Sequence, residues 1–302
     1  MKLPIRLLAS TVLTLLAASM LHAADKKVVL IAGRPSHPPG MHEFRAGMLL
    51  FEKSLAGFPG LNVVVASNGW PTKVVDGKAV DDDKVFEDAD AVVIYADGGG
   101  GHPALQGQRT ALFDRLAKKG VGLGFAHYGV EVPAGDPGAA MHRWVGGYYE
   151  HQFSVNPMWK PTFDTFPEHP VTRGVKPFAT HDEWYFNMRW IPAGQGVTPI
   201  LVSKPSDTVR KGPYVHPAGP YAHIVAAAGR SETMMWVYER AGGGRGFGFT
   251  GGHTHRNWSD PNQRKVMLNA VVWLAGLEVP ADGVNSSPGE ADLAANLDKK
   301  GR

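Results

Sequence analysis

Short apolar runs alternate with segments whose apolar residues recur at helical spacing in the first half of the chain. The apolar runs predict buried strands over residues 27–32, 61–66, 91–95 and 121–126. The segments with helical spacing predict helices over residues 41–56 and 105–116. Strands that alternate with helices favour a parallel sheet with helices on both faces, as in flavodoxin-like α/β folds.

The pattern changes in the second half of the chain. Between Tyr148 and Tyr238, β-like runs follow one another without clear helices. These runs cover residues 162–166, 197–202, 223–228 and 233–238. A strand over residues 245–250 and a helix between Asp260 and Gly276 then restore the earlier pattern. We therefore expect one α/β domain with a flavodoxin-like parallel sheet and a β-rich insertion on that domain.

The first residues are typical of a secretory signal. Lys2 and Arg6 precede an apolar segment from Leu7 to Leu21, and the small residue Ala23 follows it. The alternative is a membrane anchor, but the apolar segment has only about 15 residues and a bilayer needs about 20. We expect cleavage after residue 23, and hence a periplasmic or secreted protein. Its folded domain would span residues 24–279, and residues 280–302 would form a loose polar tail.

The charge balance excludes some partners once the signal is removed. The chain of 302 residues has 31 Lys and Arg against 28 Asp and Glu, and loss of Lys2 and Arg6 leaves 29 against 28. This near neutrality gives no electrostatic reason to bind nucleic acid or an anionic membrane. The chain contains no cysteine, which excludes a cysteine nucleophile. No G-x-G-x-x-G follows a predicted strand and Gly98–Gly101 lacks a following Lys-Ser/Thr, so no nucleotide cofactor is expected.

Histidines stand just after the predicted strands. His37 follows the first strand, His102 the third, His127 the fourth, and His253 and His255 the last. In an open parallel sheet, the loops beyond the carboxyl ends of the strands meet in one crevice, where ligands bind. Imidazole can ligate a metal ion or move protons. The alternative is that each ring bonds only a nearby backbone carbonyl.

His127 is the most informative of these residues. Small residues surround it in Gly122–Gly129, which has the form of a strand that runs into a sharp elbow. Such an elbow lifts its apex side chain above the sheet. His253 and His255 are two positions apart and would face the same way in an extended segment. His-x-His is a weak metal signal when it stands alone.

A second group of polar side chains lies inside the predicted insertion. His181, Asp182 and Glu183 place an imidazole beside two carboxylates, which could ligate a metal or carry out acid–base chemistry. The alternative is a solvated polar turn ahead of the aromatic run that includes Tyr185. Tryptophans such as Trp258 could stack on sugar rings or belong to the core, and the sequence does not separate these two roles.

These motifs, in this order, resemble the trehalose-utilisation (ThuA-like) family, whose fold resembles class I glutamine amidotransferases. The resemblance covers roughly residues 27–278. It rests on Gly33 and His37, Gly124–His127, Glu168–Val175, His181–Tyr185, Gly242–Arg245 before Phe247, and Gly252-His253. His127 stands where an amidotransferase has its cysteine, so thiolate-dependent glutamine hydrolysis is excluded. The family implies a role in the utilisation of disaccharides or their keto-derivatives, and some members are expected to hold a metal ion.

The main hypothesis is an exported enzyme that processes a sugar or glycoside by metal-assisted or His/Glu acid–base chemistry. A non-catalytic carbohydrate-binding accessory domain is the second reading, and an unrelated hydrolase or oxidoreductase subunit is the third. Any redox step would need a separate oxidoreductase partner. In the main hypothesis the catalytic residues are His127, Glu183 and Asp182. The substrate-binding residues are His102, Tyr185 and Trp258. The ligands of a divalent, zinc-type ion are His37, His127, His181 and His253, with His255 as a weaker choice.

Overall fold

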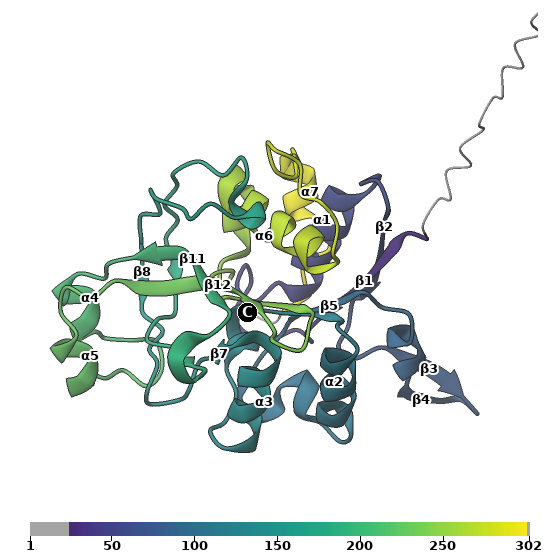
Figure 1. Ribbon diagram of the computed structural model, residues 1–302, viewed down its shortest axis with the longest axis horizontal. Helices are drawn as coiled ribbons and strands as arrows, with labels where there is room; N and C mark the ends of the chain where they lie inside the picture. Colours follow the sequence, from purple (N-terminus) through teal and green to yellow (C-terminus); the bar gives the residue numbers. More distant parts are fainter. Residues whose placement is uncertain (1–23, 301–302) are drawn as a thin grey trace, which may run out of the picture.

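A seven-stranded sheet runs through the centre of the computed structural model, which describes residues 24–300 (Figure 1). The strand order is β11-β12-β13-β6-β5-β1-β2, and the strands from β13 to β2 are parallel neighbours. These parallel strands are β1 (Lys26–Ala32), β2 (Leu61–Ala66), β5 (Ala91–Tyr95), β6 (Gly122–Ala126) and β13 (Arg245–Phe249). The flavodoxin-like parallel sheet is confirmed. The predicted signal segment, residues 1–23, lies outside the described residues.

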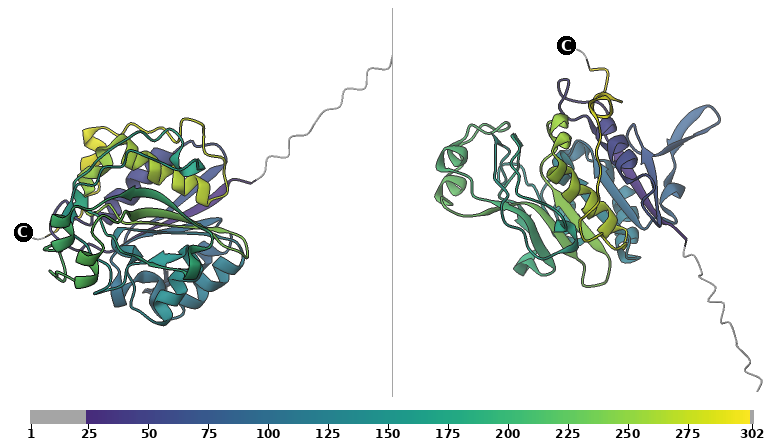
Figure 2. Two further views of the ribbon diagram at one scale, coloured as in Figure 1. Left: turned by 60° about the vertical axis from the view of Figure 1, so that its left-hand side comes forward. Right: turned by 90° about the horizontal axis from the view of Figure 1, so that it is seen from above.

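Helices cover both faces of the sheet, as the alternating pattern predicts (Figure 2). Helices α1 (Phe44–Leu55) and α6 (Pro261–Leu274) pack on one face, and α2 (Arg109–Lys118) and α3 (Asp136–Val145) pack on the other. Side chains of β1 alternate between the two layers: Val28 and Leu30 join the core under α1 and α6, while Val29 and Ile31 join the core under α2 and α3. Residues 28–32 of β1 are therefore buried on both sides, which explains why all of them are apolar.

The predicted insertion contributes two strands to the main sheet. Strands β11 (Val197–Ser203) and β12 (Glu232–Glu239) extend it in antiparallel fashion beyond β13. The strand predicted over residues 223–228 is wrong, because helix α5 (Ala222–Ala226) occupies it and the alanines there favour helix. The run over residues 162–166 forms only an isolated bridge between Phe163 and Phe178.

The remaining elements are short. The pattern gave no signal for the hairpin of β3 (Thr72–Val75) and β4 (Lys78–Asp81), whose residues are all exposed on both faces. Two further pairs each join two-residue strands within residues 147–190. They are β7 (Gly147–Tyr148) with β10 (Arg189–Trp190), and β8 (Met158–Trp159) with β9 (Asp182–Glu183). Helix α4 (Asp207–Lys211) precedes α5 in the chain.

Residues 280–300 are not the loose tail that their polarity predicts. They contain helix α7 (Glu290–Ala294), and the side chains of Val284 and Leu293 are buried. Lys53 of α1 bonds Asp292 at 2.5 Å, and the backbone N–H of Asp298 donates to Glu43 at 2.8 Å. The segment therefore packs beside α1 (Figure 1), and a few well-placed contacts hold it where the sequence shows no periodicity.

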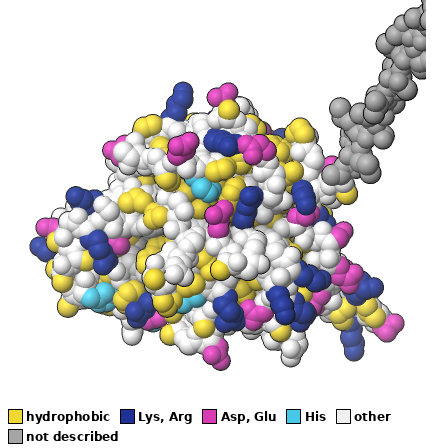
Figure 3. Space-filling view, viewed as in Figure 1, with side chains coloured by type: hydrophobic (Ala, Val, Ile, Leu, Met, Phe, Trp, Pro, Cys, Tyr) yellow, Lys and Arg dark blue, Asp and Glu magenta, His cyan; other side chains and the backbone are white. Residues whose placement is uncertain are grey.

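The surface shows mixed charge. Acidic and basic side chains are interspersed over the face drawn in Figure 3. Within residues 24–300, no helix has the length and apolar character that a membrane span requires.

Candidate metal centre

His127 lies at the apex of a sharp turn at the end of β6. The strand ends at Ala126, and a 3-10 turn begins at His127, whose φ of 53° lies in the left-handed region. Its imidazole is fully buried, and Nδ1 lies 3.0 Å from the carbonyl oxygen of Thr250. A carbonyl oxygen only accepts hydrogen bonds, so Nδ1 donates and Nε2 carries the free lone pair. The elbow thus presents one nitrogen, Nε2, above the sheet.

His42 points its Nε2 at the same place from the loop before α1. Its φ is 48°, and its backbone N–H donates to the carbonyl oxygen of His253 at 2.9 Å. Its Nδ1 lies 2.9 Å from Oδ1 of Asp97, which follows β5. Donation to this carboxylate fixes the tautomer and leaves the lone pair on Nε2. Sequence reasoning missed His42, because the predicted helix over residues 41–56 included it, whereas α1 begins at Phe44.

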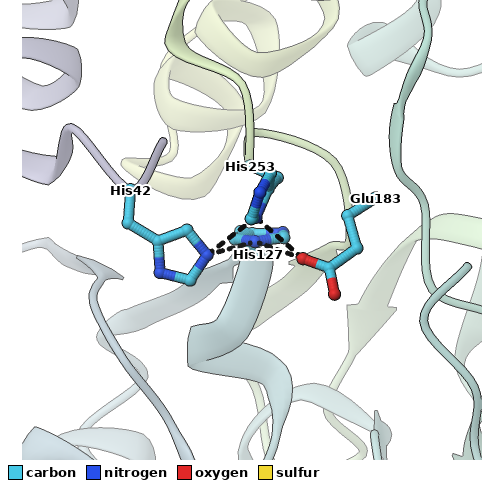
Figure 4. A group of neighbouring side chains, drawn as sticks. All are labelled: His42, His127, Glu183 and His253. Atoms are coloured by element: carbon cyan, nitrogen blue, oxygen red, sulfur yellow. Dashed lines mark hydrogen bonds and ion pairs between the residues drawn. The ribbon is translucent and has the colours of Figure 1, made fainter. Parts of the chain in front are cut away.

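Two further ligand atoms complete the group. His253 Nδ1 lies 2.9 Å from His42 Nε2 and 2.7 Å from Glu183 Oε2. Glu183 Oε2 is also 3.6 Å from His127 Nε2. The four ligand atoms lie within 4.8 Å of one another, and all four residues are buried (Figure 4). Three imidazoles and one carboxylate from four separate segments therefore converge on one point.

The nitrogen pair at the centre of this group has the geometry of a cation site. The Nε2 atoms of His42 and His127 are 2.9 Å apart, and the free lone pair of each faces the other. Burial and the neighbouring histidines lower the pKa of His42 to about 2 and hold the pKa of His127 well below its ordinary value. A shared proton is therefore disfavoured, whereas a metal ion needs neutral imidazoles. His42, His127, Glu183 and His253 can hold a divalent ion.

Asp182 and Asn156 hold the cluster in position. Asp182 is fully buried, and its two carboxylate oxygens accept the backbone N–H groups of Gly252 at 2.7 Å and Thr254 at 2.9 Å. These bonds fix the loop that carries His253. Asn156 donates its Nδ2 hydrogen to Glu183 Oε1 at 2.8 Å, which orients the other oxygen toward the histidines. Both residues therefore position the ligands and do not bind an ion themselves. The carboxylate oxygens of Asp182 already accept backbone hydrogen bonds.

Replacement of Asp182 by Asn should weaken both the fold and ion binding. An amide offers only one acceptor, so its Nδ2 group would face a backbone N–H and leave buried donors unpaired. We expect a loss of about 1–3 kcal/mol in the free energy of unfolding and a 10–100-fold loss of metal affinity, roughly the effect of removing an outer partner. Urea denaturation and calorimetric metal titration measure the two effects. Asp164→Asn, at an exposed position, is the control.

A cavity of about 350 Å³ opens beside the cluster. Two ligands, His42 and Glu183, form part of its wall. The other lining residues are His37, Tyr128, Glu131, His151, Asn156, Tyr185, Val215 and His216. Burial and the charge of Glu183 raise the pKa of Glu131 to about 7, and burial raises the pKa of Tyr128 to about 12. The cavity therefore combines hydroxyl groups, imidazoles and a proton-carrying carboxyl next to the cluster.

The structure brings together four of the residues singled out in the sequence. His127, Glu183 and His253 belong to the cluster, and the Tyr185 hydroxyl lies 3.2 Å from His127 Nε2. His37 lies next to the group rather than in it: its exposed ring is 3.6 Å from the ring of His42, centroid to centroid. It forms a more open group with His42 and Asp97.

Three other histidines predicted from the sequence lie away from the cluster. His181 is exposed, because the short strand β9 turns only Asp182 and Glu183 inward. His255 starts a 3-10 turn and directs Nε2 to the carbonyl of Leu293 at 3.0 Å. His102 uses both ring nitrogens on the backbone of Ala104 and Gly129. The placement of these three as ligands or sugar contacts is wrong.

Trp258 was expected to contact sugar, and it belongs to the core instead. Its side chain is fully buried, and its ring lies 4.8 Å from Phe51 and 5.7 Å from Phe249, measured between centroids. A residue without exposed surface cannot stack on a ligand in the cavity. A tryptophan has the same apolar ring in a core as in a sugar site, so the sequence alone does not distinguish these two roles.

Comparison with known proteins assigns the family. The family model described as trehalose utilisation (ThuA) matches residues 42–274. The chain belongs to the trehalose-utilisation family. The match contains all four residues of the cluster, from His42 to His253. No curated protein sequence matches this chain.

Two solved ThuA-like structures share the fold of this ThuA-family protein. A putative ThuA-like protein from Bacteroides uniformis has a TM-score of 0.56 and 14% identity, with 85% of this chain and 94% of that chain covered. One from Parabacteroides merdae has a TM-score of 0.50 and 14% identity, with 85% and 92% covered. A glutamine amidotransferase from Thermotoga maritima has a TM-score of 0.40 and 8% identity, with 84% and 99% covered.

Proposed function

We propose that this protein is a metal-dependent enzyme of sugar breakdown that acts on a disaccharide or its keto-derivative. The observation that carries the proposal is the convergence of His42, His127, His253 and Glu183 beside an open cavity. Nitrogen and carboxylate donors without thiolates suit a zinc-type ion. Such an ion supplies polarisation of a carbonyl group or a lowered pKa for a bound water. The family supplies the substrate class.

The protein side chains have separate tasks in this proposal. The ring of His127 is held by Thr250 and that of His42 by Asp97, so both lone pairs are pre-organised for an ion. Glu183 completes the ligand set. Tyr185 lines the cavity, and its hydroxyl lies 3.2 Å from His127 Nε2. When an ion takes the lone pair of that nitrogen, the hydroxyl is free to bond a sugar oxygen.

Export is a further part of the proposal. Residues 1–23 have the pattern of a secretory signal, and we place the mature protein in the periplasm or outside the cell. A keto-derivative of a sugar would then come from a separate oxidoreductase partner, because the sequence carries no dinucleotide-binding motif. Mass spectrometry of the protein from its native host tests this part: an intact residue 1 on the folded protein contradicts it.

Elemental analysis and a substrate screen test the enzymatic part. Purified protein should contain about one equivalent of a divalent transition metal, and a chelator should remove both the metal and the turnover of disaccharides or 3-keto-glycosides. Re-addition of Zn²⁺ should restore turnover. Sugar binding without turnover in the metal-loaded protein would support a carbohydrate-binding accessory role and overturn the enzymatic one. Full turnover in metal-free protein would overturn the metal dependence.

A further inference from the structure

Glu131 is the one carboxylate of the cavity wall that the protein leaves without a donor. Glu183 accepts from Asn156 and lies 2.7 Å from His253 Nδ1. Asp97 and Asp182, next to the cavity, are occupied by His42 and by backbone N–H groups. Within residues 24–300, the side chain of Glu131 accepts no hydrogen bond, although it is half-buried. Its oxygens are therefore available to a molecule in the cavity.

The backbone of Glu131 is fixed from both sides. Its carbonyl oxygen accepts the N–H of Gly99 at 2.9 Å, and its own N–H donates to the carbonyl of Tyr128 at 2.9 Å. It also forms a parallel bridge with Tyr149. The residue follows the 3-10 turn that begins at His127, so the same elbow presents a metal ligand and this carboxyl. Such a rigid position is what a group that must meet a substrate requires.

The groups around Glu131 make it a proton carrier rather than a fixed charge. The charge of Glu183 raises the pKa of Glu131, and the charge of Glu131 in turn raises the pKa of nearby hydroxyls. These hydroxyls belong to Tyr128, Tyr149 and Tyr185. In the metal-free protein, burial and the charge of Glu183 raise the pKa of Glu131 to about 7. A cation held by Glu183 and the histidines would lower this pKa and favour the carboxylate, which is the form that accepts a proton. A permanently ionised carboxylate would instead need a cationic partner here.

The number of free carboxylates also limits the chemistry. Most glycosidases use two carboxyl groups, one as acid and one as base or nucleophile. The cavity wall holds two, Glu131 and Glu183, and Glu183 belongs to the metal cluster. One free base beside a carbonyl-polarising ion suits removal of a proton from the carbon next to a carbonyl. Hydrolysis by a carboxylate pair fits less well.

We propose that Glu131 is the catalytic base of this site and that the substrate is a keto-sugar whose carbon acid it deprotonates. The inference rests on the proposed function above. In the step, the C–H bond next to the carbonyl breaks and its proton moves to a carboxylate oxygen of Glu131. The electron pair of that C–H bond forms a C=C bond while the carbonyl π pair moves to oxygen, which gives the enediolate. Return of a proton to carbon regenerates the ketone, and no electron acceptor is consumed.

Hydrogen–deuterium exchange in D₂O tests this step directly. The probe is methyl glucoside oxidised to the ketone at carbon 3. Proton NMR follows the loss of the signals of the hydrogens bound to the two carbons next to the carbonyl, as deuterium replaces them. Zinc-loaded protein should accelerate exchange over buffer, and Glu131→Gln should reduce that acceleration by roughly 10²–10⁴-fold, the usual contribution of a general base. Glu131→Asp should retain part of it. Glu87→Gln, at an exposed position, is the matched control and should exchange as the unaltered protein does.

Three measurements keep the outcomes distinct. Zinc content and affinity for the probe should be equal in Glu131→Gln and in the unaltered protein, because Glu131 is not a ligand. Exchange at the unaltered rate in Glu131→Gln overturns the inference and leaves the proposed function standing. Metal-dependent turnover of a glycoside without any exchange of the probe also overturns the inference and leaves the proposed function standing. Zinc-loaded protein that neither exchanges the probe nor turns over any sugar overturns the proposed function and this inference together.

Discussion

Replacement of His127 by Asn is expected to abolish turnover and to lower metal affinity by at least about 100-fold, which exceeds the usual effect of losing an outer partner. His127 supplies the Nε2 atom that faces both His42 and Glu183, so its replacement removes one of the four ligands of the cluster. Asn is the appropriate replacement because the φ of 53° at this position is one that Asn tolerates. The elbow should therefore keep its shape while the ligand is lost.

His181→Asn is the matched control for this experiment. Its imidazole is exposed, and the structure places it outside the cluster although the sequence predicted it as a ligand. Calorimetric titration of metal-free protein with Zn²⁺ should give unaltered affinity for this variant and a large loss for His127→Asn. Equal losses in both variants, or none in His127→Asn, would contradict the ligand set of His42, His127, His253 and Glu183.

The sequence predicted the central sheet because its strands obey local rules. A strand buried on both faces must be apolar throughout, and β1, β5 and β6 follow from such runs. The edge strand β2 is only partly buried, yet its valines were enough to predict it. The elbow at His127 was predicted for the same reason: a strand that ends among small residues leaves its next side chain above the sheet. The position of His253 after β13 then followed from the parallel topology.

His42 could not be found in this way, because its position depends on tertiary contacts. Its own backbone bonds His253, more than 200 residues away in sequence, and this contact places it in a loop instead of the predicted first turn of α1. Helical periodicity continues through Met41 and gives no sign of the interruption. Only the three-dimensional placement of the 252–254 loop decides where α1 begins.

His181 and His255 show the opposite failure, in which a residue of the right type lies in the wrong direction. Alternation places positions 181 and 183 on the same face of an extended strand. Strand β9 has only two residues, however, and both of them are buried. Likewise, His255 begins a 3-10 turn, so it does not share the face of His253. Two-residue spacing predicts a common direction only where the strand is long enough to impose it.

Glu131→Gln is expected to stabilise the metal-free protein at alkaline pH. The pKa of Glu131 is raised in the folded state from 4.5 to about 7, so the folded state binds its proton more tightly than the unfolded chain does. Below pH 4.5, Glu131 is protonated in both the folded and the unfolded protein, and its proton makes its full contribution to the stability of the fold. As pH rises through about 7 that contribution is lost, and ionisation in the fold costs on the order of 3 kcal/mol. Gln avoids the charge but still buries an amide, so a gain of about 2 kcal/mol is expected at pH 8.

Urea denaturation of both proteins between pH 4.5 and 8 measures this effect. The difference in the free energy of unfolding between variant and unaltered protein should rise across this range and level off above pH 7. A cation held by His42, His127, His253 and Glu183 would lower the pKa of Glu131, because an opposite charge nearby favours the ionised carboxylate. The pH-dependent difference should therefore shrink when Zn²⁺ is added. If the difference in the free energy of unfolding does not vary with pH in metal-free protein, the pKa of Glu131 is not raised in the folded state. That result would contradict the prediction.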